Sequence, residues 1–580
     1  MNKKQIPLGI DDFKEIIKKD AYFVDKTLFI KKIMENISKV VLLTRPRRFG
    51  KTLNFSMLKY FLEIPACRKL QGRDQDYSYL FKGLNISRKE DLVKKHMEKY
   101  PVIDISFKKV KANNWEDAEY YFKEEIANQY KNHRYLLDED IMLDFERIEY
   151  QRIINKQGKI YEYTSAIKKL SEYLSSLYKK NAIVLIDEYD TPLHYAKLNG
   201  YYDQMLNIMR ALMVDGMKGN KYLEKGIVTG IMKISQESIF SSFNNPEISS
   251  LTDSYCEGDF GFTEEEVSEL LDYYNLNKYK KMIEEWYNGY LFGGDTVIYN
   301  PWSVLSFVKN DNHQPQPYWI NTGDTSLIKR CMQLDEITSK DYIEKLLKGK
   351  TLEKKIDQDI VYEDVFNDVD KALSYLLHAG YLKAKRKSRE ENKYLLSIPN
   401  REIEEIYKTI LQNWFSREQK IGNLVVKLID SLLKKDFDSF EIYLQDLLII
   451  NISYYDGIKK IERSLKGEEK EKHENFYHGL ILGLMLHLSD DYYIESNKEY
   501  GKGRPDIVIL PKELNKTAFI LEFKNEYTTS SKTSKELAKA AITQIKEKQY
   551  EKGVKKTGVK QAIKLGLGFK GKEAAVEFDF

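Results

Sequence analysis

The segment Val40–Phe55, VVLLTRPRRFGKTLNF, joins a short apolar run to a helical pattern through a basic loop. The run VVLL is typical of a buried parallel strand, and TLNFSMLKYFLEI after the loop has the apolar spacing of a helix. The loop ends in the Gly-Lys-Thr of the phosphate-binding pattern GxxxxGK[ST], although arginine stands where the first glycine is usual. Because a helix N-terminus after a tight loop attracts anions, the segment predicts a nucleotide site. Its predicted phosphate contacts are Arg45, Pro46, Arg47, Arg48, Phe49, Gly50, Lys51 and Thr52.

A second, acidic motif follows at Asn181–Asp190, NAIVLIDEYD. An aspartate at the end of a buried strand can hold magnesium beside the loop hydroxyl, so Asp187 and Thr52 are the predicted Mg²⁺ ligands. Glu188 is predicted to orient or deprotonate the attacking water. Taken alone, the acidic motif could be a surface turn, and the loop could be a basic patch that happens to contain GKT. Neither alternative explains why both motifs occur in this order in one chain. The sequence has no NKxD guanine-reading motif, which favours ATP over GTP.

Further apolar runs alternate with amphipathic segments over roughly residues 1–255, which predicts a doubly wound α/β domain with a parallel sheet. One of these runs, GIVTGIMKI (Gly226–Ile234), carries Thr229 at the end of its IVTG strand. There Thr229 could sense the γ-phosphate, with Lys233 as a charge partner, although ordinary turn residues explain both positions equally well. The sequence assigns no arginine finger, and the neighbouring subunit of a homo-oligomer is one source for it.

The middle of the chain is mainly helical. The motif GFTEEEVSELLDYYN opens with Thr263 and Glu266, which are spaced as a capping box. We expect a helical lid over 256–340, a small mixed, winged-like segment over 341–400 and a helical connector over 401–463.

The last module, 464–580, contains GKGRPDIVILPKELNKTAFILEFKNE (Gly501–Glu526). Two apolar runs joined by a turn predict neighbouring strands, with Asp506 and Glu522 at neighbouring strand ends. Lys524 follows Glu522 by two residues and therefore points to the same face. Two carboxylates and a lysine in one cleft can bind Mg²⁺ and activate a water for attack on a phosphodiester. We predict Asp506, Glu522 and Lys524 as catalytic residues, with the two carboxylates as metal ligands.

Residues on the helices beside these strands are weaker candidates. Glu474 in HENFYHGLILGLML is a further carboxylate, and Gln544 and Tyr550 in SKELAKAAITQIKEKQY could contact substrate. Helix-surface or packing roles explain these three residues equally well. His473 and His478 are assigned no metal, because histidines on a helix face are more often structural.

Composition and charge argue against several other classes of protein. The sequence has no apolar run of 18 residues and no apolar segment at its start, so we expect neither a membrane span nor a signal peptide. Its three cysteines include no CxxC pair, which argues against a disulfide framework and fits the cytoplasm. Residues 501–580 carry 17 Lys and Arg against 10 Asp and Glu, a local charge of +7, whereas the whole chain has only +4. This basic end is compatible with a nucleic-acid surface, and a plain lysine coat explains it equally well.

With these motifs in view, the chain resembles a family in which an AAA-ATPase-like P-loop domain is joined to a C-terminal PD-(D/E)XK nuclease-superfamily domain. The resemblance covers nearly the whole chain and rests on IPLGIDDFKEII, RPRRFGKT, LIDEYDTPL, TGIMKISQESIFSSFNN, FGFTEEEV, IYNPWSVLSF, YWINTGD, HAGYL, SIPNREI and GRPDIVIL with FILEFK. In such proteins arginine at the Arg45 position is the usual form of the loop. The resemblance implies an α/β multidomain protein with a restriction-endonuclease-like C-terminal domain. It also implies nucleotide phosphates at Gly50, Lys51 and Thr52, magnesium near Asp187, and a nuclease site at Asp506, Glu522 and Lys524.

We therefore expect an ATP-dependent or ATP-gated nuclease that uses Mg²⁺ and acts on nucleic acid, DNA more than RNA. The general use of ATPase–nuclease fusions suggests genome defence or mobile-element conflict. The alternative is a nucleotide-dependent switch or scaffold whose nuclease-like module binds nucleic acid or a partner protein without cleaving. Glu522 and Lys524 argue against this alternative, because a pure binding module has no need of that pair. A translocase motor lacks support, since no helicase motif accompanies the loop.

Overall fold

The computed structural model divides the chain into two compact units. Unit 1 comprises Met1–Leu334 and Glu353–Ile403, and unit 2 comprises Asp335–Leu352 and Glu404–Phe580. The structure describes residues 3–73, 76–233, 246–319, 342–343, 345–357, 365, 368–388, 393–415, 419–453, 469–489, 491–496, 498–526, 531–571 and 573–580, and within these it does not describe the side chains of 410–415, 419–423, 450–453 and 469–476.

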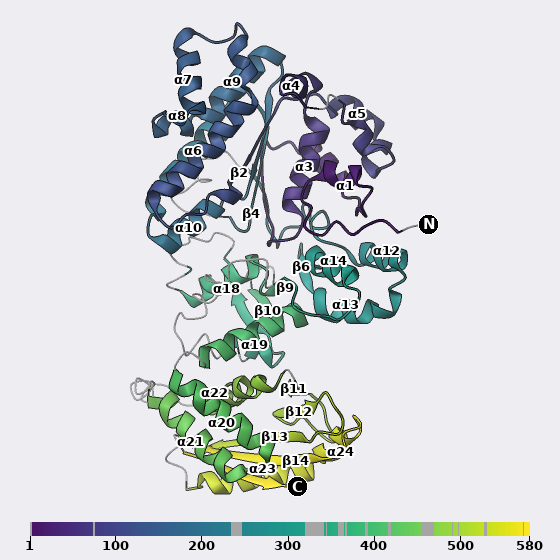
Figure 1. The fold of residues 1–580 in the computed structure, drawn as a ribbon, viewed down its shortest axis with the longest axis vertical. Helices are drawn as coiled ribbons and strands as arrows, with labels where there is room; N and C mark the ends of the chain where they lie inside the picture. The colour runs from purple at the N-terminus through teal and green to yellow at the C-terminus, as the bar shows by residue number, and fades with distance from the viewer. Residues whose placement is uncertain are drawn as a thin grey trace. The chain divides into compact units, whose positions relative to one another are not determined.

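A five-stranded parallel sheet forms the centre of unit 1. Its order is β2-β3-β4-β1-β5, and each neighbouring pair is parallel. Helices cover both faces, with α6 and α9 on one side and α1 and α3 on the other (Figure 1). The apolar sequences VVLLT of β1 and AIVLID of β3 are therefore buried along their whole length. The strands are β1 (Val40–Thr44), β2 (Val102–Ser106), β3 (Ala182–Asp187), β4 (Leu223–Gly230) and β5 (Glu247–Ser249).

The helices around this sheet mostly lie between successive strands, which is the alternation predicted from the sequence. They are α1 (Phe13–Lys18), α2 (Leu28–Glu35), α3 (Lys51–Leu62), α4 (Pro65–Leu70), α5 (Glu90–His96), α6 (Trp115–Asn132), α7 (Asp144–Ile154), α8 (Ile160–Thr164), α9 (Ala166–Tyr178), α10 (Thr191–Asn199) and α11 (Tyr202–Met217), with 3₁₀ turns at Ser78–Phe81, Asn85–Arg88, Phe107–Lys109 and Arg134–Asp138. The α/β fold with a parallel sheet predicted for the N-terminal region is confirmed.

Unit 1 continues with a helical part and a small sheet. Thr263 caps the first helix of this part as predicted: its hydroxyl accepts from the Glu266 N–H at 3.4 Å, and the Glu266 carboxylate accepts from the Thr263 N–H at 2.8 Å. The helical part contains α12 (Glu264–Tyr274), α13 (Lys280–Tyr287), the hairpin β6 (Tyr290–Phe292) and β7 (Thr296–Ile298), and α14 (Pro301–Lys309). A three-stranded sheet of order β8-β10-β9 follows, made by β8 (Leu352–Lys355), β9 (Lys383–Ser388) and β10 (Lys393–Ser397), with α18 (Val369–His378) before β9. Helix α19 (Arg401–Phe415) follows β10, and its residues from Glu404 on belong to unit 2.

Unit 2 is built on a mixed sheet of order β11-β12-β13-β14-β15. Its neighbouring pairs are antiparallel except β13 with β14, which are parallel and joined by α23 and α24. The strands are β11 (Tyr492–Ser496), β12 (Ile507–Pro511), β13 (Ala518–Glu526), β14 (Ala562–Lys570) and β15 (Glu573–Asp579), and the helices are α20 (Gln419–Lys434), α21 (Phe437–Ser453), α22 (Glu469–Met485), α23 (Ser534–Glu547) and α24 (Tyr550–Lys555), with a 3₁₀ turn at Leu486–Leu488.

The alternation of side chains along this sheet gives two cores. Ile507, Phe519 and Leu521 face a core shared with α20, α21 and α22. Val508 and Ile520 face the opposite core, which α23 and α24 cover. Two glycines let α23 lie directly on the sheet: a Cβ at Gly566 would be 2.3 Å from the Ala538 carbonyl, and one at Gly568 would be 1.9 Å from the Ser534 carbonyl.

The five-segment division expected from the sequence stays a prediction. Residues 256–319 pack within unit 1, and α20 and α21 of the expected connector belong to unit 2. None of the described helices is long and apolar enough to cross a membrane. Parts of the TGIMKISQESIFSSFNN and YWINTGD segments, at 234–245 and 320–324, lie outside the described residues.

Candidate functional sites

The loop between β1 and α3 has the geometry of a phosphate-binding turn. Helix α3 begins at Lys51, directly after Gly50, whose φ of +86° is readily adopted only by glycine. Arg48 also has a positive φ, +68°, whereas Arg45 does not. The position where the usual pattern has its first glycine therefore needs no glycine in this loop.

Arg45 is a structural residue of this loop. Its guanidinium is fully buried and donates to the carbonyls of Ser249 at 2.8 Å and Cys256 at 3.1 Å. It also lies 5.3 Å from the ring centres of Phe260 and Phe292, and burial lowers its pKa to about 10. These contacts hold the end of β1 to the segment after β5. Arg45 does not line the cavity described next, so the structure does not bring this predicted phosphate contact to the site.

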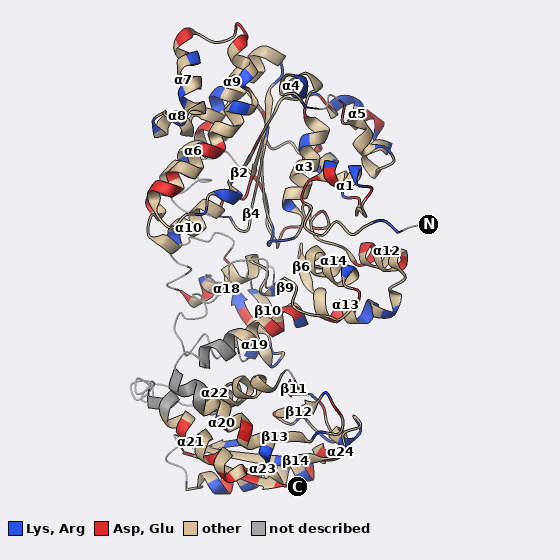
Figure 2. Cartoon of the chain, in the orientation of Figure 1, with Lys and Arg blue, Asp and Glu red and all other residues tan. Residues whose placement is uncertain are grey.

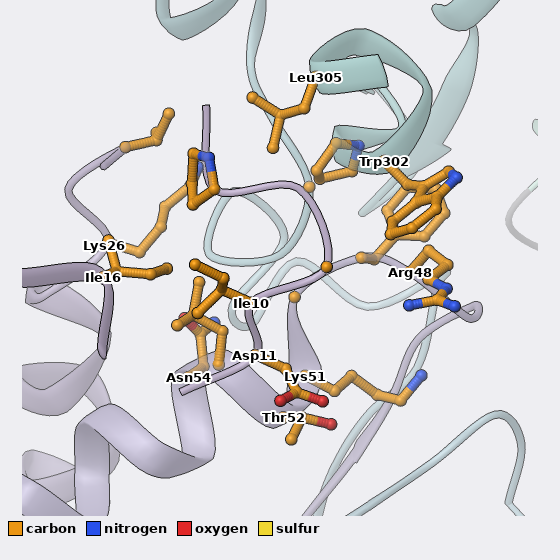
Figure 3. Close-up of a pocket in the computed structure, with 18 of the residues that line it drawn as sticks. Ile10, Asp11, Ile16, Lys26, Arg48, Lys51, Thr52, Asn54, Trp302 and Leu305 are labelled. Atoms are coloured by element: carbon orange, nitrogen blue, oxygen red, sulfur yellow. The ribbon is translucent and has the colours of Figure 1, made fainter. Parts of the chain in front are cut away.

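A cavity of about 250 Å³ lies over the loop and the start of α3. Arg47, Arg48, Phe49, Gly50, Lys51 and Thr52 line it, whereas Pro46 does not. Figure 3 shows Lys51 and Thr52 at one end and Trp302 and Leu305 of α14 at the other. Six lysine and arginine side chains line it against three carboxylates, those of Asp11, Glu188 and Asp259. The cavity lining therefore has an excess of positive charge together with apolar side chains, which include Leu8, Ile10, Val24, Phe262, Trp302 and Leu305.

Lys51 is buried against the loop that it follows. Its ammonium donates to the carbonyls of Arg45 at 2.9 Å and Pro46 at 2.8 Å. Burial lowers its pKa, and the nearby Glu188 and Asp187 carboxylates oppose that shift. A lysine held in this way can exchange carbonyl oxygens for phosphate oxygens without a change of backbone.

Asp187 contacts two other predicted site residues, Thr52 and Thr229. Its two carboxylate oxygens accept from the Thr52 hydroxyl at 2.7 Å and from the Thr229 hydroxyl at 2.5 Å. Burial raises the pKa of Asp187, and both hydroxyls act in the opposite direction. A hydroxyl beside a carboxylate is an oxygen set that suits Mg²⁺, so Thr52 and Asp187 fit the predicted metal.

Glu188 has an unusual backbone. Its φ is +54°, a left-handed conformation that residues other than glycine and asparagine seldom adopt. Its carboxylate lines the cavity and accepts from the Thr191 hydroxyl at 3.0 Å. The next residue holds the turn in place, because the Tyr189 N–H donates to the Thr229 carbonyl at 3.0 Å. This backbone holds a carboxylate beside the phosphate loop.

Asp190 is a neighbouring residue that the sequence analysis missed. Its carboxylate accepts from the Ile231 N–H at 2.7 Å, and burial raises its pKa to about 6. It thereby anchors the strand end that carries Thr229. Lys233 follows on the same segment and does not line the cavity.

Later segments of unit 1 contact the phosphate loop. The Arg48 guanidinium carbon lies 4.2 Å from the Trp302 ring centre, and the Phe49 ring packs edge-on against Tyr290 at 5.0 Å. Pro46 lies against Gly380, where an added Cβ would be 3.0 Å from the proline. The IYNPWSVLSF and HAGYL segments thus pack on the loop, a contact that no local pattern in the loop sequence indicates.

In unit 2 the strand register places Asp506 opposite Glu522. Ile507 pairs with Leu521 in the antiparallel β12–β13 ladder, and one further step reaches these two carboxylates. The Asp506 carboxylate accepts from the Phe523 N–H at 2.8 Å. The Lys524 ammonium is 3.7 Å from a carboxylate oxygen of Glu522, which is itself buried. Asp506, Glu522 and Lys524 are therefore together on one face of the sheet.

The weaker candidates on α23 and α24 also reach this face. The Gln544 amide donates to the Glu522 carboxylate. Tyr550 is buried beside them; burial raises its pKa, and its hydrogen bond with Gln544 acts in the opposite direction. The side chain of Glu474 lies outside the described residues. His478 reaches from the other face, with its Nε2 atom 3.1 Å from the Asp506 carbonyl, and burial lowers its pKa to about 3.

The donor set suits a hard divalent cation. The described residues contain no group of three or more His, Cys, Asp or Glu placed to hold a metal. Asp506 and Glu522 would therefore hold an ion jointly with water and substrate oxygens, which is the usual way in which Mg²⁺ binds.

Comparison with known proteins found two family models that match this chain, one over each of the two candidate sites. The model of a family described as "Predicted AAA-ATPase" matches residues 7–240, and a PD-(D/E)XK nuclease superfamily model matches residues 472–579. An "Uncharacterized protein in vnfD 5'region" of Azotobacter chroococcum mcd 1 is 24% identical over 563 residues, which cover 95% of this chain and 93% of the relative. Residues 7–240 are thus an AAA-ATPase-like region, and residues 472–579 are a domain of the PD-(D/E)XK nuclease superfamily.

Proposed function

We propose that this protein binds and hydrolyses ATP and uses its C-terminal domain to cleave phosphodiester bonds in nucleic acid, with DNA favoured over RNA. The observation that carries the proposal is the convergence of Asp506, Glu522 and Lys524 on one sheet face, in a chain that also has a phosphate loop. ATP and Mg²⁺ are the proposed cofactors. We also propose that the protein acts in the cytoplasm, in genome defence or mobile-element conflict. It would act there as a homo-oligomer or with a partner protein.

At the nucleotide site, the loop N–H groups and Lys51 would bind the phosphates, and the apolar wall with Trp302 would bind the base. Thr52 and Asp187 would hold Mg²⁺, which neutralises phosphate charge when bound. Glu188 would orient the attacking water and accept its proton. Thr229 would position Asp187, because its hydroxyl already donates to that carboxylate.

At the nuclease site, Asp506 and Glu522 would hold Mg²⁺, which when bound lowers the pKa of a water and polarises the phosphate. Lys524 would stabilise the negative charge that develops on the attacked phosphate. Gln544 would orient Glu522 through the hydrogen bond that it donates. Tyr550 would help to hold Gln544 in place through the hydrogen bond between the two side chains.

A second candidate function is a nucleotide-dependent switch or scaffold without cleavage. The contacts of Arg48 with Trp302 and of Pro46 with Gly380 favour it, since they connect the nucleotide loop to later segments of unit 1. Two results together would favour this second function. The wild type would show no Mg²⁺-dependent cleavage, and nucleic-acid binding would survive every nuclease-site substitution.

The test is cleavage of plasmid DNA, linear DNA and RNA of the same sequence with Mg²⁺. Asp506→Ala and Glu522→Ala should abolish cleavage, whereas Glu573→Ala, which removes an exposed carboxylate from β15, should leave it unchanged. Equal cleavage by all the proteins would assign the activity to a contaminant. ATP turnover with and without DNA is measured in parallel, and turnover that survives Lys51→Ala would refute the nucleotide-site assignment.

A further inference from the structure

Lys108 is a cation of the nucleotide cavity to which the function proposed above gives no role. It lies in the 3₁₀ turn Phe107–Lys109, directly after β2. Strands β2 and β3 are parallel neighbours, and Ser106 pairs with Asp187 at their carboxyl ends. Lys108 and Glu188 therefore follow adjacent strands at the same edge of the sheet, and both line the cavity. Since the water that Glu188 would orient reacts at the terminal phosphate, this edge is where that phosphate would lie.

The partner of Lys108 is itself a residue of the cavity. The Lys108 ammonium nitrogen is 3.0 Å from a carboxylate oxygen of Asp11, and the two side chains are 50% and 56% exposed. An ion pair this accessible to water contributes little to stability, so a phosphate oxygen can replace the carboxylate. Lys26 of the same cavity differs, because its partner Glu266, at 2.6 Å, is only 22% exposed and does not line the cavity. Lys108 therefore has a partner that a ligand in the cavity can exchange.

Asp11 is held close to α3, the helix that follows the phosphate loop. The next residue, Asp12, caps α1, and its carboxylate accepts from the Tyr60 hydroxyl of α3 at 2.7 Å. Figure 3 shows Asp11 at the end of the cavity where Lys51 and Thr52 lie. The N-terminal segment thus brings a negative charge to the part of the cavity that is proposed to bind phosphates.

The charge of Asp11 also acts on the phosphate loop. Burial lowers the pKa of Arg48, and the Asp11 and Glu188 carboxylates oppose that shift. Asp11 therefore balances part of the positive charge of the cavity lining. A triphosphate in the cavity would bring its own negative charge close to Asp11, and like charges at short range repel each other. Binding of a triphosphate and the contact between Asp11 and Lys108 thus oppose each other.

We propose that Lys108 binds the terminal phosphate of ATP and that Asp11 competes with this phosphate for the lysine. This role rests on the nucleotide site proposed above and adds a specificity-determining residue to it. ADP has no phosphate at this position, so Lys108 distinguishes the triphosphate from the diphosphate. The cation comes from the same chain as the phosphate loop and needs no neighbouring subunit.

The experiment compares AMP-PNP, an ATP analogue that resists hydrolysis, with ADP, by calorimetric titration of the full-length chain with Mg²⁺. Lys108→Met keeps the length of the side chain and removes its charge. It should weaken the binding of AMP-PNP about tenfold or more and that of ADP less than about threefold. Asp11→Asn removes the competing anion, so it should tighten the binding of AMP-PNP about threefold or more and change that of ADP less.

Opposite effects of the two substitutions distinguish this role from that of a structural ion pair. Loss of a structural pair would change the affinity in the same direction in both variants. Lys109→Met, in the same 3₁₀ turn, and Asp20→Asn, whose carboxylate contacts Lys4 at 2.6 Å, lie outside the cavity and are the matched controls. They should leave both affinities unchanged. All four positions are exposed, so none of the substitutions should change the melting temperature without nucleotide appreciably.

The proposal is overturned if Lys108→Met weakens ADP binding as strongly as AMP-PNP binding, or if Asp11→Asn weakens AMP-PNP binding. Lys51→Ala separates this outcome from failure of the nucleotide site itself. AMP-PNP binding that is lost in Lys51→Ala and unaffected by Lys108→Met overturns the role of Lys108 alone. Absence of nucleotide binding by the wild type, or full binding by Lys51→Ala, refutes the nucleotide site and the role of Lys108 with it.

Discussion

The guanidinium of Arg48, in the phosphate loop, lies over the ring of Trp302 in the first turn of α14, at 4.2 Å from its centre (Figure 3). Both side chains also line the nucleotide cavity. The loop and the helical part of unit 1 therefore share one wall of the site, and a nucleotide in the cavity would contact both.

Trp302→Ala should weaken ATP binding to the full-length protein by about twofold to thirtyfold, the range that a cation–π contact of partly buried groups supports. The loss should be less than additive with that of Arg48→Ala, because both substitutions remove the contact between these two side chains. ATP affinity is measured for the wild type, both single variants and the double variant. Trp286→Ala, at a tryptophan of the same helical part that does not line the cavity, is the matched control. Additive losses would show that the two side chains act independently.

Glu188 offers a test of backbone strain at the proposed catalytic carboxylate. Glu188→Gly and Glu188→Ala both remove the carboxylate, and both should lose most ATP turnover. A left-handed φ costs an alanine roughly 1–2 kcal/mol that glycine avoids, so the glycine variant should be the more stable of the two by about 1 kcal/mol. Chemical unfolding monitored by circular dichroism measures the difference. Equal stability of the two variants would contradict the positive φ of Glu188.

Glu402 should give the stability of unit 1 a measurable pH dependence. Its carboxylate accepts from the Ser303 hydroxyl at 2.8 Å and the Trp319 N–H at 2.8 Å, and burial raises its pKa from 4.5 to about 7. Between pH 4.5 and about pH 7 the Glu402 carboxyl is protonated in the folded protein, whereas in the unfolded chain it has released its proton. The folded state should therefore gain up to about 3 kcal/mol as the pH falls from about 7 to about 4.5.

The measurement is the free energy of unfolding against pH for the wild type and Glu402→Gln, which keeps the shape and cannot ionise. The difference between the two curves isolates Glu402, because buried His378, whose pKa is lowered to about 4, acts with the opposite sign in both proteins. Parallel curves would mean that the pKa of Glu402 is not raised.

The fold was predictable because its signals are local. Apolar runs such as VVLL and IVLI predict buried parallel strands, and the two-residue spacing of Glu522 and Lys524 predicts a shared face. The role of Arg45 is different, since its guanidinium meets carbonyls about 200 residues further along the chain. The contact of Arg48 with Trp302 likewise depends on tertiary packing that no local pattern encodes.

The basic excess of residues 501–580 left two readings open, a nucleic-acid surface and a plain lysine coat. Figure 2 shows acidic residues interspersed among the lysines of unit 2. Several of these lysines are in ion pairs: Lys564 contacts Glu551 at 2.9 Å and Asp579 at 2.7 Å, and Lys516 contacts Glu513 at 3.1 Å. Net charge counts residues, whereas a binding surface depends on which of them are paired.

Gln544 provides the sharpest test of the nuclease site. Its amide donates to the Glu522 carboxylate, so it should orient a metal ligand without binding the metal itself. Loss of such a partner typically weakens metal binding or activity 10- to 100-fold. Gln544→Ala should accordingly raise the Mg²⁺ concentration needed for half-maximal cleavage by about tenfold or more, with much of the maximal rate recovered at high Mg²⁺.

Thr543→Ala, at the exposed preceding position of α23, is the matched control and should leave the Mg²⁺ titration unchanged. Lys524→Ala should behave differently from Gln544→Ala. The lysine is proposed to act on the developing phosphate charge, so its loss should lower the maximal rate about 100-fold at every Mg²⁺ concentration. If excess Mg²⁺ rescued Lys524→Ala and failed to rescue Gln544→Ala, the roles assigned to these two residues would be wrong.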